Sequence, residues 1–570
     1  MSSYKIKNID YSKITKYTDT SVSPLIDKLL YLRGVSTKQA VEDFLNPDYD
    51  KHLHSPELLH DMEKACRRIE QAITKKEKIA IFSDYDCDGI PGGVILHDFF
   101  KSINYNFFEN YIPHRHYEGF GLSKMALDIL AERKVKLVIT VDCGISNVEE
   151  VEYAKKLGID IIITDHHQPD NKLPMAVAIV NPLLGNYPFS GLCGAGVAFK
   201  LVQAMLNKNR YGLIEGYEKW WLDMVAIATI ADMVPLRNEN RVLAYYGLKV
   251  LRRSRKRPGL VRLLQKNGVK QDKMTEEDIG FTIGPRINAA SRMDTPGIAF
   301  KLLTETDVVR AEKLLSDLES LNIKRKSQVS IITKKIHKHL KDKDLPAVLV
   351  FGDSGWRPSL VGLTAGKLAE EYKCPVFIWG TDGNGVYKGS CRSGNSVSVV
   401  ELMRSVHEVF IEFGGHHGAG GFSIKDEYIF EFGDRLNQAY SSLFESKGVT
   451  TNDDLIVVDS EILLSDVNQY FINQLNRLAP FGEDNPKPIF AFESVSPSRV
   501  ETFGKNNEHT KLIFSTNGLS IEAVAFFKKP TDFNECPKTD KICTLLGTVE
   551  QSWFRGRQQI RIMIIDVVKD

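Results

Sequence analysis

Short apolar runs alternate with amphipathic segments through the first half of the chain. The apolar runs cover residues 78–83, 136–141, 160–164 and 176–180, and a helical pattern at 148–157 separates two of them. Fully apolar strands that alternate with helices are typical of a parallel sheet covered on both faces. The pattern therefore predicts an α/β domain over residues 78–300.

Helical patterns flank this domain on both sides. Residues 58–73 place apolar side chains on one helical face, which indicates a helical segment over residues 1–77. After the domain, an apolar stripe continues from about residue 306 to residue 341. At 1.5 Å per residue this helix spans roughly 50 Å. We predict that it connects two domains, with the connector covering residues 301–345.

Two further regions follow the connector. Residues 346–450 begin with the apolar run 347–351 and contain a glycine-rich stretch at 414–421. They read as a second α/β domain, and the glycine-rich stretch as a loop whose amides form an anion-binding nest. Residues 454–570 contain short β-like runs between turn residues. This pattern predicts a small barrel of the OB type.

The composition is that of an ordinary globular protein. Of 570 residues, 43% are hydrophobic and 26% charged, and no run of about twenty apolar residues occurs. The first residues carry no apolar secretory segment, so we expect a cytoplasmic protein. The eight cysteines form no CxxC pair and no local cluster, which suggests neither a zinc ribbon nor a disulfide framework. A net charge of +1 leaves nucleic-acid binding dependent on a local basic face.

The first apolar run ends in three carboxylates at alternate positions, Asp84, Asp86 and Asp88, followed by Gly89. Anions crowded in this way repel one another unless a cation lies between them. Carboxylate oxygens favour Mg²⁺ or Mn²⁺. Calcium is an alternative, but the twelfth position of an EF-hand loop would be Ile95 instead of Glu. An acidic turn without a ligand is the other alternative.

Further candidate ligands follow the next strands of the same predicted sheet. Asp142 comes after the second strand, and Asp165, His166 and His167 come after the third. Ligands bind at the carboxyl ends of parallel strands, so these side chains should converge. Together they suffice for two metal ions about 3.5–4 Å apart, as in phosphoester hydrolysis. Asp232 follows a helical pattern, and a structural role remains open for it.

The later regions carry weaker candidates. The stretch 283–294 is rich in small residues and carries Arg286 and Arg292, which suits a phosphate site or a surface loop with solvated arginines. His416 and His417 favour a phosphate or nucleic-acid backbone over a metal, because no carboxylate lies near them in sequence. Near the end of the chain, aromatic and basic residues interleave: Trp553, Phe554, Arg555, Arg557 and Arg561. They form either a platform for single strands or ordinary β-core aromatics with surface arginines.

Taken in order, these motifs resemble the DHH phosphoesterase superfamily. The resemblance is carried by Asp84-Tyr-Asp-Cys-Asp-Gly89, Val141-Asp-Cys-Gly144, Asp165-His-His167 and Ala231-Asp232. Within it, the chain is similar to the bacterial exonucleases that digest single-stranded DNA. That narrower likeness adds Tyr31-Leu-Arg-Gly34, Tyr111 to Gly119 with Arg115, Asn238-Glu-Asn-Arg241, Gly414-Gly-His416 and Leu478 to Pro486. It covers nearly the whole length.

The resemblance implies a DHH catalytic domain (78–300), a connector helix (301–345), a DHHA1-type substrate-binding domain (346–450) and an OB-like domain that binds DNA (454–570). It implies two Mn²⁺ or Mg²⁺ ions and assigns roles to twelve residues. The metal ligands would be Asp86, Asp88, Asp142, His166 and Asp232, the catalytic residues Asp84 and His167, and the substrate-binding residues Arg115, Arg292, Ser390, Arg392 and His416. Arg115, Ser390 and Arg392 would lie at the 5′-terminal phosphate.

The implied activity is 5′-to-3′ hydrolysis of single-stranded DNA in repair and recombination, with single-strand-binding protein and a helicase as candidate partners. Superfamily enzymes that act on oligoribonucleotides, cyclic dinucleotides or pyrophosphate are a first alternative, but they are generally shorter and lack the barrel. A non-catalytic scaffold is a second, but its acidic ligands would be lost. Pro91 and Trp356-Arg-Pro-Ser359 depart from the usual pattern and bear on substrate fit and rate.

Overall fold

The computed structural model describes residues 4–7, 23–293, 296–341, 343–382, 385–394, 397–445, 455–516, 519–554 and 557–570, without the side chains of residues 444, 445, 516, 519, 553, 554 and 557. The chain divides into two compact units. The larger comprises Pro56–Asp232 and Leu251–Thr451. The smaller comprises Met1–Ser55, Met233–Val250 and Asn452–Asp570.

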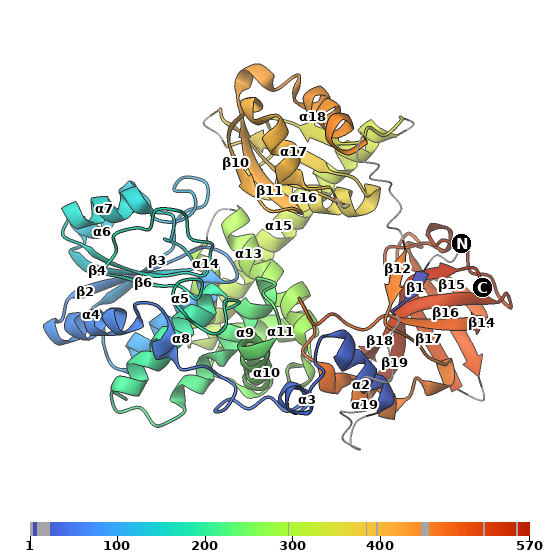
Figure 1. Ribbon diagram of the computed structural model, residues 1–570, viewed down its shortest axis with the longest axis horizontal. Coiled ribbons are helices and arrows are strands. Elements are labelled where there is room, and N and C mark those ends of the chain that lie inside the picture. The colour runs from blue at the N-terminus through green and yellow to red at the C-terminus, as the bar shows by residue number, and fades with distance from the viewer. Residues whose placement is uncertain are drawn as a thin grey trace. The chain divides into compact units, whose positions relative to one another are not determined.

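The predicted parallel sheet is present in the larger unit. Its strands run in the order β3 (Phe108–Tyr111), β2 (Lys78–Ser83), β4 (Val135–Val141), β5 (Asp160–Thr164) and β6 (Ala178–Val180), and every pair is parallel. Helices α6 (Lys124–Glu132) and α7 (Val148–Lys156) share one hydrophobic core with alternate residues of β2, Ala80 and Phe82. Helices α5 (Gly89–Ser102) and α8 (Gly194–Lys208) pack together and against the strands (Figure 1). All five strands therefore end at one edge.

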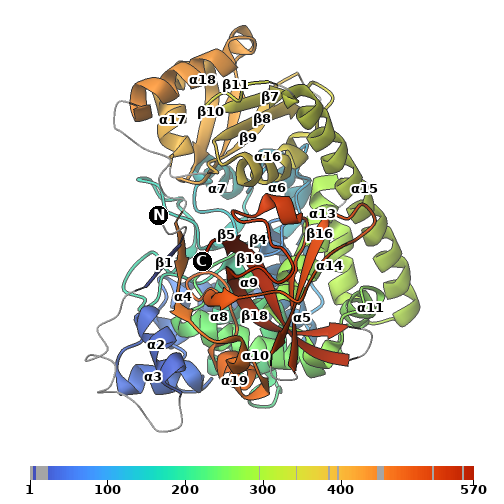
Figure 2. The same cartoon turned by 90° about the vertical axis from the view of Figure 1, so that its right-hand side faces the viewer.

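A long helix, α15 (Val308–Leu340), follows this domain, as the apolar stripe predicts. The side chain of Asp307 caps it by accepting a hydrogen bond from the amide of Arg310 at 2.8 Å. Along its length α15 packs against α11 (Pro258–Lys266), α13 (Gly284–Met293), α14 (Gly297–Thr304) and α16 (Pro358–Tyr372) (Figure 2). Ile332, Ile336 and Leu340 enter a core shared with α16 and the second sheet. The helix thus connects two cores, as expected.

The second sheet of the larger unit is mixed. Its order is β10 (Phe410–Gly415), β11 (Ala419–Ile424), β9 (Tyr387–Arg392), β8 (Val376–Thr381) and β7 (Leu349–Gly352), and only β7 and β8 are parallel. The prediction of a glycine-rich loop at 414–421 was wrong, because most of it forms the β10–β11 hairpin. Glycine lets these strands approach closely: a Cβ on Gly420 would lie 2.9 Å from the Gly414 carbonyl oxygen of the paired strand.

The smaller unit contains the predicted barrel. Its sheet runs β13 (Ser460–Glu461), β14 (Phe490–Val495), β18 (Cys543–Phe554), β19 (Arg557–Val568), β17 (Leu519–Ala525), β16 (His509–Thr516) and β15 (Arg499–Phe503). Strands β17 and β19 pair in parallel, and β14 to β19 otherwise pair antiparallel. Of the aromatic and basic residues predicted as a platform, Arg555 and the side chains of Trp553, Phe554 and Arg557 lie outside the described residues. Arg561 is described and pairs with Glu550 at 2.7 Å.

Helices α2 (Pro24–Leu32) and α3 (Lys38–Leu45) complete the barrel's core, since Ile26, Leu29, Leu30 and Leu45 pack with Phe490 and Phe492. A buried polar junction holds them there. Arg33 donates to Asn485 Oδ1 at 2.7 Å, and Asn485 donates to the carbonyls of Leu478 and Pro480. Arg241, on α10 (Asn238–Arg253), lies 3.7 Å from the ring centre of Phe44 and donates to the Leu478 carbonyl. Three short motifs noted in the sequence thus meet at one structural junction.

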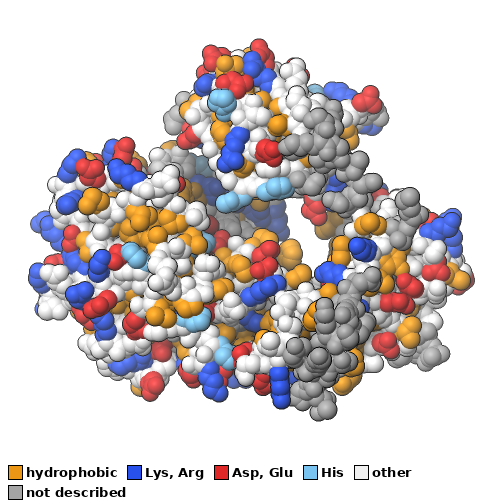
Figure 3. All heavy atoms as spheres, in the orientation of Figure 1, with side chains coloured by type: hydrophobic (Ala, Val, Ile, Leu, Met, Phe, Trp, Pro, Cys, Tyr) orange, Lys and Arg blue, Asp and Glu red, His pale blue; other side chains and the backbone are white. Residues whose placement is uncertain are grey.

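The surface is mixed in charge. On the face shown in Figure 3, basic and acidic side chains are interspersed. In the described part of the chain, no helix is both long and apolar enough to cross a bilayer. The net charge therefore does not locate a functional site, and the local groups must be considered instead.

Candidate active site

The carboxyl edge of the parallel sheet gathers the predicted acidic residues and histidines. Asp84 follows β2, Asp142 follows β4, and His166 and His167 follow β5. Asp232 ends the helix α9 (Leu222–Ala231). Their ligand atoms form three overlapping groups, each within 4.8 Å: Asp142 with His166 and His167; Asp88 with His166 and Asp232; Asp84 with Asp86 and Asp142. The convergence expected from the strand pattern is thus present in the structure.

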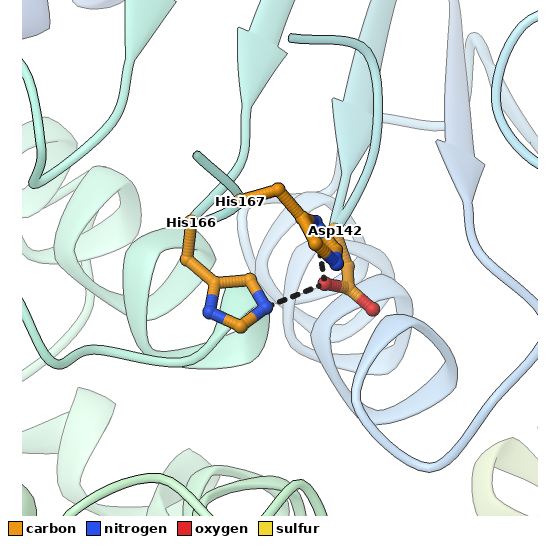
Figure 4. A group of neighbouring side chains, drawn as sticks. All are labelled: Asp142, His166 and His167. Carbon is orange, nitrogen blue, oxygen red and sulfur yellow. Dashed lines mark ion pairs between the residues drawn. The ribbon is translucent and has the colours of Figure 1, made fainter. Parts of the chain in front are cut away.

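His166 contacts three carboxylates, and Figure 4 shows it with one of them, Asp142, and with His167. Its Nε2 is 3.2 Å from Asp142 Oδ1, 3.6 Å from Asp88 Oδ2 and 3.7 Å from Asp232 Oδ2. His167 approaches the same oxygen of Asp142, with Nδ1 at 3.9 Å. One imidazole nitrogen therefore faces three carboxylates from three different segments.

The backbone holds the carboxylates in place. Asp88 accepts hydrogen bonds from the amides of Gly194 and Ala195, at 2.6 and 2.7 Å. These amides lie in the first turn of α8, where no carbonyl of the helix can accept from them. Asp142 adopts a left-handed conformation (φ 62°) directly after β4. A Cβ on Gly194 would lie 2.5 Å from the Cβ of Asp142, so only glycine allows α8 to begin this close to the strand end.

The electrostatics show that the acidic group carries more negative charge than the neighbouring His167 and Arg115 offset. Burial and the neighbouring carboxylates raise the pKa of Asp84 and Asp142 well above its usual range. The same causes raise the pKa of Asp232 to about 8. Oδ1 of Asp84 and Oδ1 of Asp142 are buried and accept no hydrogen bond from the described residues. Oxygen-rich ligands with one or two imidazoles fit Mn²⁺ or Mg²⁺, and such an ion would neutralise these anions.

Asp165 plays a different part from the other carboxylates. Burial alone would raise its pKa, but the hydrogen bond from His167 and the amides of Ile145 and His167 lower it. Asp165 Oδ1 lies 2.8 Å from His167 Nδ1, and this hydrogen bond raises the pKa of His167 to about 9. Asp165 therefore orients the ring of a cationic His167 through Nδ1. The sequence indicated the carboxylate but not this orienting role.

Cationic side chains from both domains of the larger unit accompany the acidic group. The guanidinium of Arg115 lies 4.9 Å from the ring centre of Tyr85. Tyr85 stands between Asp84 and Asp86 in the sequence, so Arg115 lies close to the acidic group. Ser390 and Arg392 lie on β9, and a Cβ on Gly362 of α16 would be 3.1 Å from Ser390 Oγ. Burial lowers the pKa of Arg392. The structure thus holds Arg392 in a poorly solvated place, which strengthens its interaction with an anion.

Arg292 links the two domains of this unit. It lies on α13, which the sequence did not identify as a helix, and its Nη1 donates to the Ser359 carbonyl at 2.8 Å. Burial, and then Arg115 and Arg325, lower the pKa of Arg292 to about 10. Arg286 on the same helix pairs with Glu319 at 2.6 Å, so its role is structural. Arg357, which departs from the family pattern, donates to the Met293 carbonyl at 3.2 Å.

His416 stands apart from the other predicted residues. It is exposed in the turn between β10 and β11, where its amide donates to the Ala419 carbonyl at 2.8 Å. Among the described residues, no ion pair or ring contact connects it to the acidic group or to the arginines. The structure therefore places His416 on a hairpin and shows no contact between it and the described residues of the site.

The barrel carries an aromatic group that the sequence did not reveal. On neighbouring strands the His509 ring lies 4.9 Å from Phe503, 5.4 Å from Phe526 and 4.7 Å from Phe527. Phe526 and Phe527 are 44% and 81% exposed. The strand register, which pairs Phe503 with His509 and places β17 beside β16, brings these rings together.

Comparison with known proteins identifies three domains. Residues 78–229 match the DHH family N-terminal domain, residues 344–442 the DHHA1 domain, and residues 458–566 the RecJ OB domain. The single-stranded-DNA-specific exonuclease RecJ of Bacillus subtilis (strain 168) is 34% identical over 573 residues, which cover 99% of this chain and 70% of that protein.

Solved structures give the same result. RecJ from Thermus thermophilus in complex with Mn²⁺ aligns with a TM-score of 0.81 at 26% identity, over 100% of this chain and 79% of the other. The same protein in complex with Mg²⁺ aligns with a TM-score of 0.75 at 24% identity, over 100% and 78%. The predicted fold class, a parallel-sheet domain, long helix, second α/β domain and OB-like barrel, is thereby confirmed.

Proposed function

The chain belongs to the RecJ family of single-stranded-DNA-specific exonucleases, and from this membership we propose that it removes nucleotides from the 5′ end of single-stranded DNA. It is a metal-dependent exonuclease. The observation that supports the proposal most directly is the presence, in one unit, of a buried acidic group and of arginines that form no ion pair with any described residue. The first binds cations and the second binds the phosphates of a strand. The OB domain argues against superfamily members that act on small nucleotides, and the acidic ligands against a scaffold.

The metal ligands in this proposal are Asp86, Asp88, Asp142, His166 and Asp232, with Asp84 beside them. Mn²⁺ or Mg²⁺ held there supplies Lewis-acid stabilisation of the phosphodiester and a water of lowered pKa. Two ions are expected, as in the sequence-based prediction. His167, kept cationic by Asp165, donates a hydrogen bond from Nε2 to a phosphate oxygen. Such a charge-assisted bond is stronger than one between neutral groups.

The polarity in this proposal comes from the arginines. Arg115, Ser390 and Arg392 bind the 5′-terminal phosphate, and Arg292 binds the scissile one. A guanidinium matches two phosphate oxygens in one plane, so a terminal phosphate with its extra charge is favoured over an internal one. His416 is proposed to contact the strand from its exposed hairpin. Release then proceeds from the 5′ end.

The barrel is proposed to hold the strand elsewhere along its length. Phe503, His509, Phe526 and Phe527 offer ring surfaces on which successive bases can stack. Because every base has a flat face, such contacts bind DNA without selecting a sequence. This agrees with an exonuclease that must accept any strand.

The proposed setting is DNA repair and recombination in the cytoplasm. A single-strand-specific enzyme cannot act on duplex ends, so a helicase would supply its substrate, and single-strand-binding protein would cover the same strand. Either partner would be detected by a change in the rate of degradation of duplex or covered DNA when the purified partner is added.

The test is hydrolysis of single-stranded DNA labelled at the 5′ or the 3′ end, with Mn²⁺, beside the same strand annealed to its complement. Early release of the 5′ label as mononucleotide from the single strand, absent in Asp142→Ala, is expected. Early release of the 3′ label would reverse the polarity. Binding of the strand without cleavage by the wild type would favour a scaffold.

A further inference from the structure

One side of the long helix α15 carries polar residues where α13 packs against it. Asn322 is 2% exposed, and Arg325 and Gln328 follow at helical spacing, so the three share a face. The facing helix α13 carries Asn288 and Arg292, four residues apart. Apolar side chains normally fill a helix–helix contact of this kind, so each polar group here needs an explanation.

Several of these polar atoms are buried without a partner. Among the described residues, no hydrogen bond satisfies Arg325 Nε, Gln328 Oε1 or Asn288 Oδ1, although each atom is buried. A buried polar atom left in this state costs about 1–3 kcal/mol. Arg325 is nevertheless held in a defined position, because its Nη2 donates to Asn322 Oδ1 at 2.9 Å. The site is therefore ordered but incomplete.

Arg325 also lacks a counter-charge. Within the described ranges, no carboxylate lies within ion-pair distance of Arg325 or of Arg292, whereas Arg286 nearby is neutralised by Glu319. Arg325 contributes to lowering the pKa of Arg292, so the two charges act on each other. Burial and Arg286 lower the pKa of Arg325 itself. Two partly buried guanidinium groups that repel each other are stabilised together when an anion joins them.

Arg325 is separate from the residues proposed for the 5′-terminal and scissile phosphates. It lies on α15, which packs against α13, the helix that carries Arg292. In an enzyme that removes one nucleotide at a time from the 5′ end, every other phosphate of the strand lies on the 3′ side of the scissile one. Any further phosphodiester that Arg325 binds is therefore on that side.

We propose that Arg325 binds a phosphodiester of the substrate strand on the 3′ side of the scissile one, and that Asn322 positions its guanidinium. The inference rests on the proposed function, whose residues do not include Arg325. A contact beyond the scissile phosphate makes a longer strand a better substrate than a dinucleotide. The contact also fixes the position of the strand before cleavage, and it does not involve the metal ligands.

The test uses 5′-phosphorylated strands in which each phosphodiester after the scissile one is replaced in turn by a neutral methylphosphonate. Release of the first nucleotide is measured in a single turnover with Mn²⁺. In the wild type, one replacement is expected to slow release about tenfold, because it removes a charge-assisted hydrogen bond to the strand. Arg325→Gln should be slowed about tenfold on the unmodified strand and show no further loss at that position.

Two controls separate a phosphate contact from a structural role. Lys326→Gln removes the same charge from an exposed neighbour and should keep the full methylphosphonate effect. On a 5′-phosphorylated dinucleotide, which has no phosphodiester beyond the scissile one, Arg325→Gln and the wild type should be equal. A structural role would slow both substrates alike.

The outcomes are distinct. If no methylphosphonate replacement slows the wild type, the inference is overturned, whether or not the variant folds well. It is also overturned if Arg325→Gln and every replacement slow release by independent factors that multiply. If the wild type releases no nucleotide with Mn²⁺, the proposed function fails and the inference fails with it. Arg325→Lys, which keeps the charge, should recover most of the rate on the long strand.

Discussion

The two sheets of the larger unit use the same α/β layering for opposite charges. In the parallel sheet, strand ends and one helix end bring carboxylates together around histidines. In the mixed sheet, β9 carries Ser390 and Arg392, whose side chains lie beside Gly362 of α16. The first arrangement attracts metal ions and the second attracts phosphates. Hydrolysis of a phosphodiester needs both bound metal ions and bound phosphates. The contrast therefore indicates that the two sheets of one unit supply these two requirements separately.

The largest effect is expected where the acidic group loses a ligand. Asp142→Asn should lower kcat/KM on single-stranded DNA about 1000-fold or more, because several kcal/mol of charge stabilisation depend on the metal site. The rate is measured with Mn²⁺ over a range of concentrations.

The matched measurement for this variant is thermal unfolding. Metal-free Asp142→Asn should be at least as stable as the metal-free wild type, because a buried carboxylate among like charges is removed. Mn²⁺ should raise the Tm of the wild type and not that of the variant. A large fall in the metal-free Tm would instead assign the lost activity to misfolding.

A smaller effect is expected on the cationic side. Arg392→Gln should lower kcat/KM about 10- to 100-fold on a 5′-phosphorylated strand, the loss of a hydrogen bond to a charged group. A strand with a 5′-hydroxyl should be nearly unaffected, because it lacks the terminal phosphate. Arg404→Gln, an exposed arginine on α17 (Val399–Ser405), serves as the control. Equal losses on both strands would remove Arg392 from the 5′-phosphate site.

These variants also show what the sequence could and could not reveal. Strands of fully apolar residues predicted the parallel sheet, and the rule for strand ends then brought together Asp84, Asp142 and His166. No comparable rule applies to the arginines, because they come from a loop, a helix and a mixed sheet whose packing the sequence does not state. The hairpin at 414–421 was missed because its glycines suit a tight strand pairing as well as a loop.

Aromatic stacking tests whether charge alone holds the strand. Phe527→Ala should raise KM for long single strands about fivefold, near the lower end of what one stacked base contributes, and leave kcat unchanged. Because Phe527 is 81% exposed, its truncation should not affect folding. Phe430→Ala is the control, since Phe430 is 95% exposed and lies outside the barrel. An unchanged KM for Phe527→Ala would exclude this aromatic group from the strand's path.

The smallest expected effect is a change in the pH dependence of stability, which is measured without substrate and distinguishes the two sheets. The pKa of Asp232 is raised to about 8 in the folded, metal-free protein, against about 3.9 when unfolded, so the folded state binds more protons between these values. Metal-free stability should therefore fall as the pH rises from 5.5 to 8, by about a few °C in Tm. Asp232→Asn should flatten part of this slope, and Mn²⁺ should suppress it.

The mixed-sheet domain provides the contrast. The amide of Gly355 and the ammonium of Lys335 lower the pKa of Asp353, so its contribution is complete above the unfolded pKa and is lost only at lower pH. Asp353→Asn should therefore shift the Tm equally at pH 5.5 and at pH 8. If it changed the slope as Asp232→Asn does, the pH dependence would reflect carboxylates in general. The acidic edge would then not be a site that needs a cation to be stable.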